Sequence, residues 1–200
     1  MRPFKRLSDG MLSPGTTWLM VLFVFFATIL CSAQSVRAED SSPSPYVNIY
    51  GFGSVGSDME TMSNAALGLG WLARAGIRMD WLGLFVECQR DHWVALETDI
   101  HFNKGVLNMG IGADVLLMDG RLKMSLAMGT STLMFDAIFD KAGTTGFYID
   151  FQPTVFRWPL WSKLVLEFSP FGAVLQVPAV AAPMLKRLAY RTSVGLEWQF

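Results

Sequence analysis

The chain has 200 residues, of which 52% are hydrophobic and 16% are charged, with 16 Lys and Arg against 17 Asp and Glu. This slightly acidic balance, without a basic stripe, argues against a nucleic-acid-binding protein. Beyond residue 38 no uninterrupted apolar run is long enough for a transmembrane helix, so the apolar residues must lie in another kind of element.

The first 38 residues have the organisation of an export signal. Three basic residues among the first six precede an apolar run over residues 17–31, and the small residues that follow end at Ala38. We predict a cleaved signal peptide over residues 1–38, with a second candidate cleavage position after Ala33. The alternative is a retained membrane anchor, for which the apolar run is short.

Residues 39–45 are polar and rich in Pro and Ser, which predicts a disordered lead-in after cleavage. Cleavage would remove four basic residues and one acidic residue, so the remaining chain is more acidic than the whole. Its single thiol is Cys88, and an internal disulfide is therefore excluded in the exported protein.

From Tyr46 onward, apolar and polar residues alternate in segments separated by turn residues. A period of two predicts β-strands, and the glycines within several segments disfavour helices. In chain order, the pattern predicts eight strands, over residues 46–56, 66–80, 93–102, 106–118, 121–133, 146–157, 163–173 and 190–200. Pro153 and Pro170 interrupt the sixth and seventh strands, where they mark either strand ends or a shifted register.

The predicted connections differ in length. Long ones follow the first, fifth and seventh strands, over residues 57–65, 134–145 and 174–186, whereas Asp119-Gly120 is a two-residue hairpin signal. Two links break the alternation, a long one over residues 81–92 and a short one over residues 103–105. Long loops at one end and short turns at the other are typical of membrane barrels.

These elements predict an all-β fold, an eight-stranded antiparallel up-and-down transmembrane β-barrel over residues 46–200. Its apolar rows would face lipid. An aromatic girdle is expected at the periplasmic interface, formed by Tyr46, Trp81, Trp93, Trp158, Trp161, Trp198 and Phe200. The alternative is a soluble lipocalin-like barrel, in which the apolar rows would surround a ligand.

The last strand alternates hydrophobic residues and ends in an aromatic residue. In this feature the chain resembles the small eight-stranded outer-membrane β-barrels of Gram-negative bacteria, whose terminal strand is recognised by the barrel-assembly machinery. The resemblance implies an outer-membrane location and contact with outer-membrane lipids and lipopolysaccharide. It also implies an assembly signal at Tyr190, Val194, Leu196, Trp198 and Phe200.

Many charged residues fall on the predicted inward faces. The expected lumen network comprises Arg74, Arg78, Glu97, Asp99, His101, Asp114, Arg121, Lys123, Arg191 and Glu197. A barrel of this size is about wide enough for side chains to fill it, and unpaired charges in a low-dielectric lumen are costly. We therefore predict a lumen plugged by ion pairs; the alternative is a narrow pore.

Neither a metal nor a cofactor is expected. Glu97, Asp99 and His101 alternate along one predicted strand, so the outer two would lie about 13 Å apart, too far for one ion. A site made by two of them with Asp114 stays open. Residues 51–56 match the dinucleotide pattern GxGxxG, but no helix follows them. We expect these glycines to make room for bulky inward neighbours.

Some barrels of the resembled class modify lipid A with a His and a Ser. Here His92 is predicted at the periplasmic end, and His101 points inward, where only a favourable register would bring it to Ser125. The prediction is therefore a non-enzymatic outer-membrane protein with a structural, surface-interaction or limited small-solute role. The alternative function is a lipid A-modifying enzyme.

Overall fold

The computed structural model describes residues 42–58, 66–95, 104–136, 142–180 and 185–200. The described residues all belong to one compact unit, Ser41–Phe200. The expected signal peptide therefore lies outside the described residues. Within them, no helix is long and apolar enough to cross a membrane.

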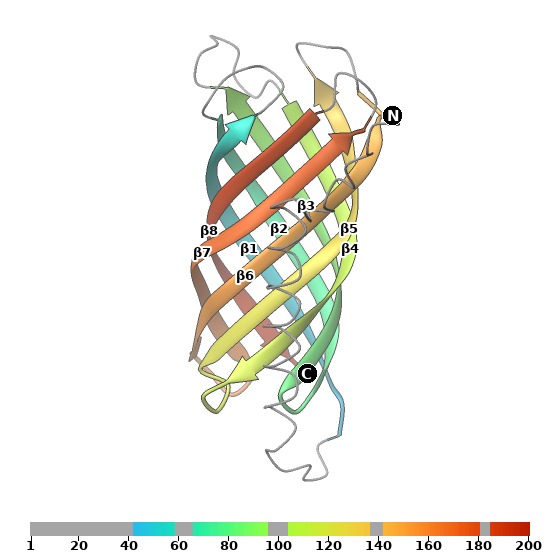
Figure 1. Ribbon diagram of the computed structural model, residues 1–200. Coiled ribbons are helices and arrows are strands. Elements are labelled where there is room, and N and C mark those ends of the chain that lie inside the picture. The colour runs from blue at the N-terminus through green and yellow to red at the C-terminus, as the bar shows by residue number, and fades with distance from the viewer. Residues whose placement is uncertain (1–41, 59–65, 96–103, 137–141, 181–184) are drawn as a thin grey trace, which may run out of the picture. The chain divides into compact units, whose positions relative to one another are not determined.

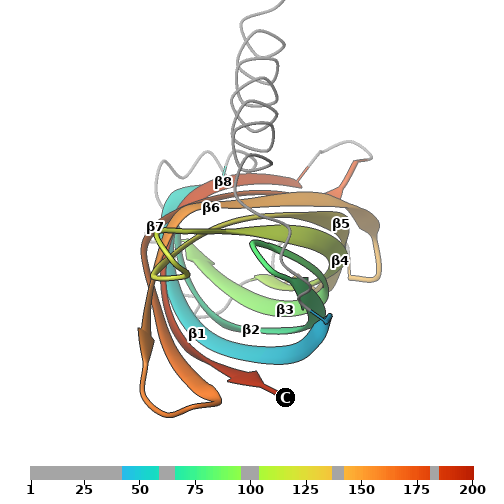
Figure 2. The same ribbon diagram turned by 90° about the horizontal axis from the view of Figure 1, so that it is seen from below.

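The described residues form a closed antiparallel barrel of eight strands (Figure 1). The strands are β1 (Ser44–Asp58), β2 (Ala66–Met79), β3 (Leu82–Ala95), β4 (Lys104–Leu117), β5 (Leu122–Asp136), β6 (Thr145–Pro159), β7 (Leu164–Ala179) and β8 (Leu185–Gln199). Each strand pairs with its neighbours in the chain, and β1 also pairs with β8, which completes the ring visible in Figure 2. Because closure leaves no strand edge unpaired, the backbone can lie in hydrocarbon, and the predicted fold class is confirmed.

The connections alternate without exception. Short turns join β2 to β3, β4 to β5 and β6 to β7 at one end, which we call the turn end. The longer connections leave the strands at the opposite end, which we call the loop end. The first residue of β1 and the last of β8 also lie at the turn end, where Phe200 N–H donates to the Pro45 carbonyl at 3.1 Å.

The predicted third strand over residues 93–102 is wrong. β3 spans Leu82–Ala95 and covers most of the segment 81–92 that was expected to be a loop; residues 96–102 lie outside the described residues. Polar residues occupy both faces of β3, for example Glu87 inward and Arg90 outward, which hides its alternation. With β3 in this place, both exceptional connections disappear.

Several strand ends also differ from the expectation. β1 begins at Ser44, inside the expected lead-in over 39–45. β7 continues to Ala179 and β8 begins at Leu185, so strands enter the segment 174–186 that was expected to be a loop. β5 likewise runs to Asp136, into the expected loop over 134–145. The two prolines mark irregular pairing within strands rather than strand ends. The register shifts between Phe151 and Thr154, beside Pro153, and again between Ser169 and Gly172, beside Pro170. A bulge accommodates a proline because it releases one ladder hydrogen bond.

The polarity of the barrel is inverted relative to a soluble protein. Ile49, Leu69 and Ile111 on the outer face are 60–66% exposed. On the inner face of the same strands, charged residues such as Arg74 and Asp114 are at most 2% exposed. An exposed apolar belt around a charged interior is stable in a bilayer and not in water. The barrel is therefore a transmembrane barrel, and the lipocalin-like alternative is wrong.

Candidate functional site

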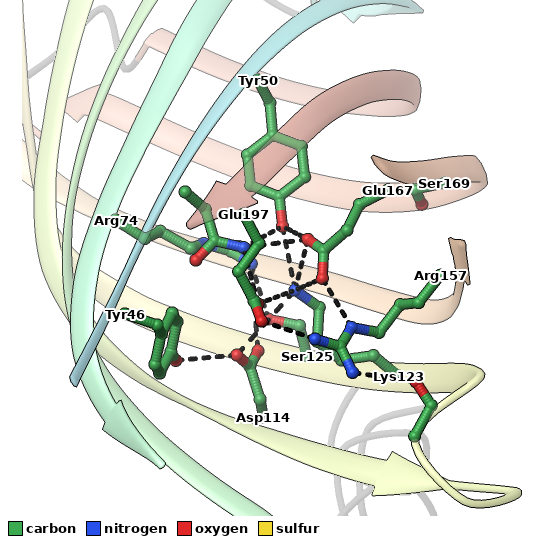
Figure 3. A network of polar contacts seen from close by, with 12 residues as sticks. Tyr46, Tyr50, Arg74, Asp114, Lys123, Ser125, Arg157, Glu167, Ser169 and Glu197 are labelled. Carbon is green, nitrogen blue, oxygen red and sulfur yellow. Dashed lines mark hydrogen bonds and ion pairs between the residues drawn. The ribbon is translucent and has the colours of Figure 1, made fainter. Parts of the chain in front are cut away.

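The inner face of the turn end carries a dense group of ion pairs, shown in Figure 3. We call it the basal cluster and define it as Arg78, Asp114, Lys123, Arg157, Glu167 and Glu197. Glu167 lies at its centre. Its carboxylate accepts hydrogen bonds from Lys123 Nζ at 2.6 and 2.7 Å, from Arg157 Nε at 2.8 Å and from Asn48 Nδ2 at 2.9 Å. Tyr50 also donates to it.

Glu197 is the second carboxylate of the basal cluster. It pairs with Arg78 and accepts a hydrogen bond from Arg157 Nη2 at 2.5 Å. Arg157 therefore bridges the two glutamates, and its Nη1 donates to the Gly120 carbonyl at 2.8 Å. Because Gly120 belongs to the turn between β4 and β5, this hydrogen bond connects the basal cluster to a turn at the end of the barrel.

The middle of the lumen is organised around Arg74 of β2. Its Nε donates to Glu87 Oε2 at 2.8 Å and its Nη1 to Ser125 Oγ at 2.9 Å, while its guanidinium lies 4.4 Å from the centre of the Phe85 ring. Tyr148 donates to the other oxygen of Glu87 at 2.7 Å. A single buried arginine thus joins three strands, with both hydrogen-bond and cation–π contacts.

The loop end of the lumen is closed in a different manner. Arg187 donates to Asp91 at 3.1 Å and to Ser54 at 2.7 Å, and it lies 5.1 Å from the Trp93 ring. Beside it lies an apolar cluster, which we call the apolar cap: Trp93, Val106, Leu133, Ala179 and Leu185, each at most 1% exposed. Ion pairs dominate the turn end, whereas the loop end combines the apolar cap with the buried pair of Arg187 and Asp91.

The lumen charges are nearly balanced. Seven basic and six acidic side chains among the described residues are buried: Arg74, Arg78, Lys104, Lys123, Arg157, Arg187 and Arg191, and Glu87, Asp91, Asp114, Asp150, Glu167 and Glu197. Such balance is expected, since an unpaired buried charge costs several kcal/mol (about 3–5 when one partner is removed). Further ion pairs join Arg191 to Asp150 and Arg187 to Asp91.

A layer of neutral polar groups accompanies the ions. Gln89, Asn108, Gln152 and Gln176 are at most 1% exposed, and the amide nitrogens and oxygens of Gln89, Asn108 and Gln152 have no partner among the described residues. Buried amides of this kind normally bind ordered water. The polar lumen is thus chemically suited to hold water.

Small residues make room for the large side chains. A Cβ at Gly195 would collide with the Tyr50 ring, and a Cβ at Gly112 would collide with the Phe85 ring. Gly51 and Gly53 behave differently, because they lie on the outer face, with no atom within 4 Å of a Cβ at Gly51. The expectation that these two glycines accommodate inward neighbours is wrong, since strand parity turns them toward the outside.

The residues predicted to line the lumen fall into three groups according to their place in the structure. Arg74, Arg78, Asp114, Lys123, Arg191 and Glu197 are buried inside the barrel and take part in ion pairs. Glu97, Asp99 and His101 lie outside the described residues. Arg121 is exposed in the turn before β5, so its expected place in the lumen is wrong. The connection takes four residues, 118–121, where two were expected, so Arg121 lies outside the strand.

Several lumen residues escaped the sequence analysis. Glu87 and Asp91 lie on the misplaced third strand. Arg157 and Glu167 lie on β6 and β7 near the bulges, where the alternation of the sequence is interrupted. Arg187 belongs to a segment expected to be at the edge of a loop. In β3 and β8 the inward row could have been found by continuing the period of two through the polar residues, whereas the bulge at Pro153 shifts the inward parity between Gln152 and Arg157.

The aromatic residues assigned to the girdle separate into two groups. Trp158, Trp161, Trp198 and Phe200 are 45–71% exposed and lie near the turn end, and Trp81 is half-buried in the turn after β2. Two assignments are wrong. Tyr46 is 1% exposed and donates to Asp114 at 2.8 Å inside the lumen, and Trp93 belongs to the apolar cap at the loop end. Both residues have inward parity, which overrides their preference for the interface.

The remaining assigned residues lie as follows. Tyr190, Val194, Leu196, Trp198 and Phe200, the expected assembly signal, have outward, exposed side chains (44–63%). Ser125 is buried in the lumen against Arg74, away from lipid. His92, expected at the periplasmic end, lies instead on the outer face of β3 near the loop end. No group of three or more His, Cys, Asp or Glu among the described residues has the arrangement of a metal site.

The comparisons with known proteins concern the fold. No protein-family model matches the chain, and no curated protein matches it. The crystal structure of Neisserial surface protein A superposes with a TM-score of 0.56 at 14% identity, covering 80% of this chain and all of that one. Ail, the attachment invasion locus protein of Yersinia pestis, in complex with sucrose octasulfate, gives 0.45 at 7% identity, covering 78% and 99%. The chain therefore has the fold of the small eight-stranded outer-membrane β-barrels.

Proposed function

We propose that this protein is a non-enzymatic, non-conducting barrel of the outer membrane of a Gram-negative bacterium. Its role is to present the connections at the loop end on the cell surface. In this arrangement the turn end faces the periplasm, as short turns do in outer-membrane barrels. The observation that carries the proposal is the filled lumen: the basal cluster lies across one end and the apolar cap across the other.

The likeness to a Neisserial surface protein in fold supports this assignment. Chemistry supports it too. An ion that entered the lumen would have to displace Lys123 and Arg157 from Glu167, contacts of 2.6–2.8 Å, and then pass the Arg187–Asp91 pair and the apolar cap. Removing a charge from its buried partner costs about 3–5 kcal/mol, so steady flow is unfavourable.

Two experiments test the proposal. Expression in a Gram-negative host followed by membrane fractionation should place the folded protein in the outer membrane; recovery from the soluble periplasm would refute the location. Recording from purified protein in a planar bilayer should give no steady conductance, with an open porin in the same bilayer as the positive control. Regular single-channel steps would refute the plugged lumen and favour the narrow pore.

The enzymatic alternative has its own test. Ser125 is bound to Arg74 in the lumen, which disfavours it as a nucleophile toward lipid. We expect the lipid A of the expression host to have the same mass spectrum with and without the protein. A new lipid A species that disappears in the S125A variant would establish the enzyme.

A further inference from the structure

Arg90 occupies an unusual place on the outer face of β3. Within the strands, as far as they are described, it is the one exposed charged side chain. Its neighbours in the sheet are Trp71 of β2 and Leu107 of β4, both members of the apolar belt. An arginine on the lipid face costs about 2–4 kcal/mol at the bilayer midplane and about 0–1 kcal/mol near the interface, so its depth decides whether it is tolerated.

The depth of Arg90 follows from its place in the strand. It lies eight residues beyond Leu82, the first residue of β3 at the turn end. At a rise of about 3.3 Å per residue and a tilt of about 40°, this corresponds to about 20 Å along the barrel axis. The apolar belt of such barrels is about 25 Å tall. The guanidinium can therefore extend to the headgroup level of the leaflet at the loop end.

His92 is the next outward residue of β3 toward the loop end, and it is half-buried. Arg90 offers N–H donors at the upper margin of the belt, and His92 lies beside it on the same strand. The planar guanidinium of Arg90 matches a phosphate group with two parallel hydrogen bonds. The Asp and Glu side chains that the structure describes within the strands are buried in the lumen, so none of them lies beside Arg90 on the outer face.

A groove runs over the outer face beside these residues. It has a volume of about 610 Å³, and His92 forms part of its lining together with Leu67, Leu69, Val55 and Tyr190. Its floor is Gly53 of β1, where a Cβ would meet only Leu69 Cδ2, at 3.8 Å. Gly51 continues the open floor toward the turn end, along a second, contiguous depression. The volume and the apolar lining of such a groove suit an acyl chain.

We propose that a phosphorylated lipid of the outer leaflet binds at this place. Its phosphate contacts Arg90, and one of its acyl chains lies in the groove over Gly51 and Gly53, which His92 borders. Charge complementarity selects the headgroup, because Arg90 requires an anion, and the surrounding belt selects an apolar chain. The inference rests on the proposed outer-membrane orientation, which turns the loop end toward the outer leaflet.

The test measures the binding of bisphosphorylated lipid A to the purified full-length barrel in detergent. Native mass spectrometry gives the fraction of the protein that carries the lipid. We expect R90Q to bind lipid A about tenfold more weakly than wild type, equivalent to about 1.4 kcal/mol. The matched control is R121Q, which removes an exposed arginine at the turn end and should bind as wild type does. Fully dephosphorylated lipid A should bind wild type and R90Q equally.

A second pair of variants tests the groove. G53L fills the floor and should weaken lipid A binding about as much as R90Q. A113L places the same leucine side chain on the outer face of β4, outside the groove, and should have no effect. Retained electrophoretic heat-modifiability confirms that each variant is folded.

The phosphate site would be refuted if R90Q bound lipid A as tightly as wild type does, or if R121Q lost as much affinity for lipid A as R90Q does. If G53L bound lipid A as tightly as wild type does, the acyl chain would not lie in the groove. The groove assignment would also fail if the wild-type protein formed a dimer that G53L abolished, because a second copy of the chain would then occupy the groove. These outcomes are separate from the proposed function, which is judged by fractionation and conductance. If the protein were found in the outer membrane and R90Q bound lipid A as wild type does, the proposed function would stand and the lipid site would be refuted.

Discussion

Lys123 of β5 and Glu167 of β7 form an ion pair of 2.6 Å inside the barrel, although 44 residues separate them in the chain. β6 lies between the two strands in the sheet, so the ion pair connects strands that are not neighbours and stabilises the turn end of the barrel. Asn48 of β1 and Arg157 of β6 also donate to Glu167. Four strands therefore depend on one carboxylate.

Replacement of Glu167 by Gln should lower the free energy of unfolding by about 3–5 kcal/mol, because Lys123 and Arg157 would keep their charges without their partner. The measurement is equilibrium unfolding by urea in lipid vesicles, followed by tryptophan fluorescence. D119N is the control, since Asp119 is exposed in the turn after β4, and it should change the free energy little. A mild effect of E167Q would mean that water compensates the two cations.

Replacement of Gly195 by Ala should also destabilise the barrel, by about 1–3 kcal/mol, because the new methyl group meets the Tyr50 ring and the Ile49 carbonyl. G51A provides the matched control on a neighbouring strand, where the same methyl group enters open space. Urea unfolding in vesicles separates the two variants. Equal stabilities would contradict the close packing of Tyr50 against β8.

The inverted polarity predicts a dependence on depth. I111R places a charge in the middle of the belt and should cost about 2–4 kcal/mol, whereas M79R, at the turn-end limit of β2, should cost about 0–1 kcal/mol. Unfolding of both variants in vesicles gives the difference. If M79R lowered the free energy of unfolding more than I111R does, the middle of the apolar belt would not lie at the level of Ile111.

The last residue should matter for assembly and little for stability. Phe200 is 63% exposed, and its backbone N–H donates to the Pro45 carbonyl. F200A should therefore unfold in vesicles within about 0.5 kcal/mol of wild type after refolding in vitro. In cells its yield in the outer membrane should fall, if the assembly machinery recognises the ring. Normal cellular yield would remove Phe200 from the assembly signal, and Q199A serves as the neighbouring control.

The class of this protein was determined by the sequence alone. An apolar-polar alternation of period two, carried by segments too glycine-rich for helices, assigns one face to lipid and one to the lumen without any knowledge of contacts. The same alternation places Arg74, Asp114, Lys123 and Glu197 on inward rows. These are local properties of a strand, and each strand expresses them independently of its partners.

The identity of the partners was decided only by the tertiary structure. Closure and tilt of the barrel determine which inward residues share a level, so that Arg157 meets both Glu167 and Glu197 while Trp93 enters the apolar cap. β3 escaped prediction because Arg90 and His92 on its outer face break the pattern that defines a lipid-facing row. Alternation specifies a face, whereas contact across the lumen depends on the register of all eight strands, which no single segment encodes.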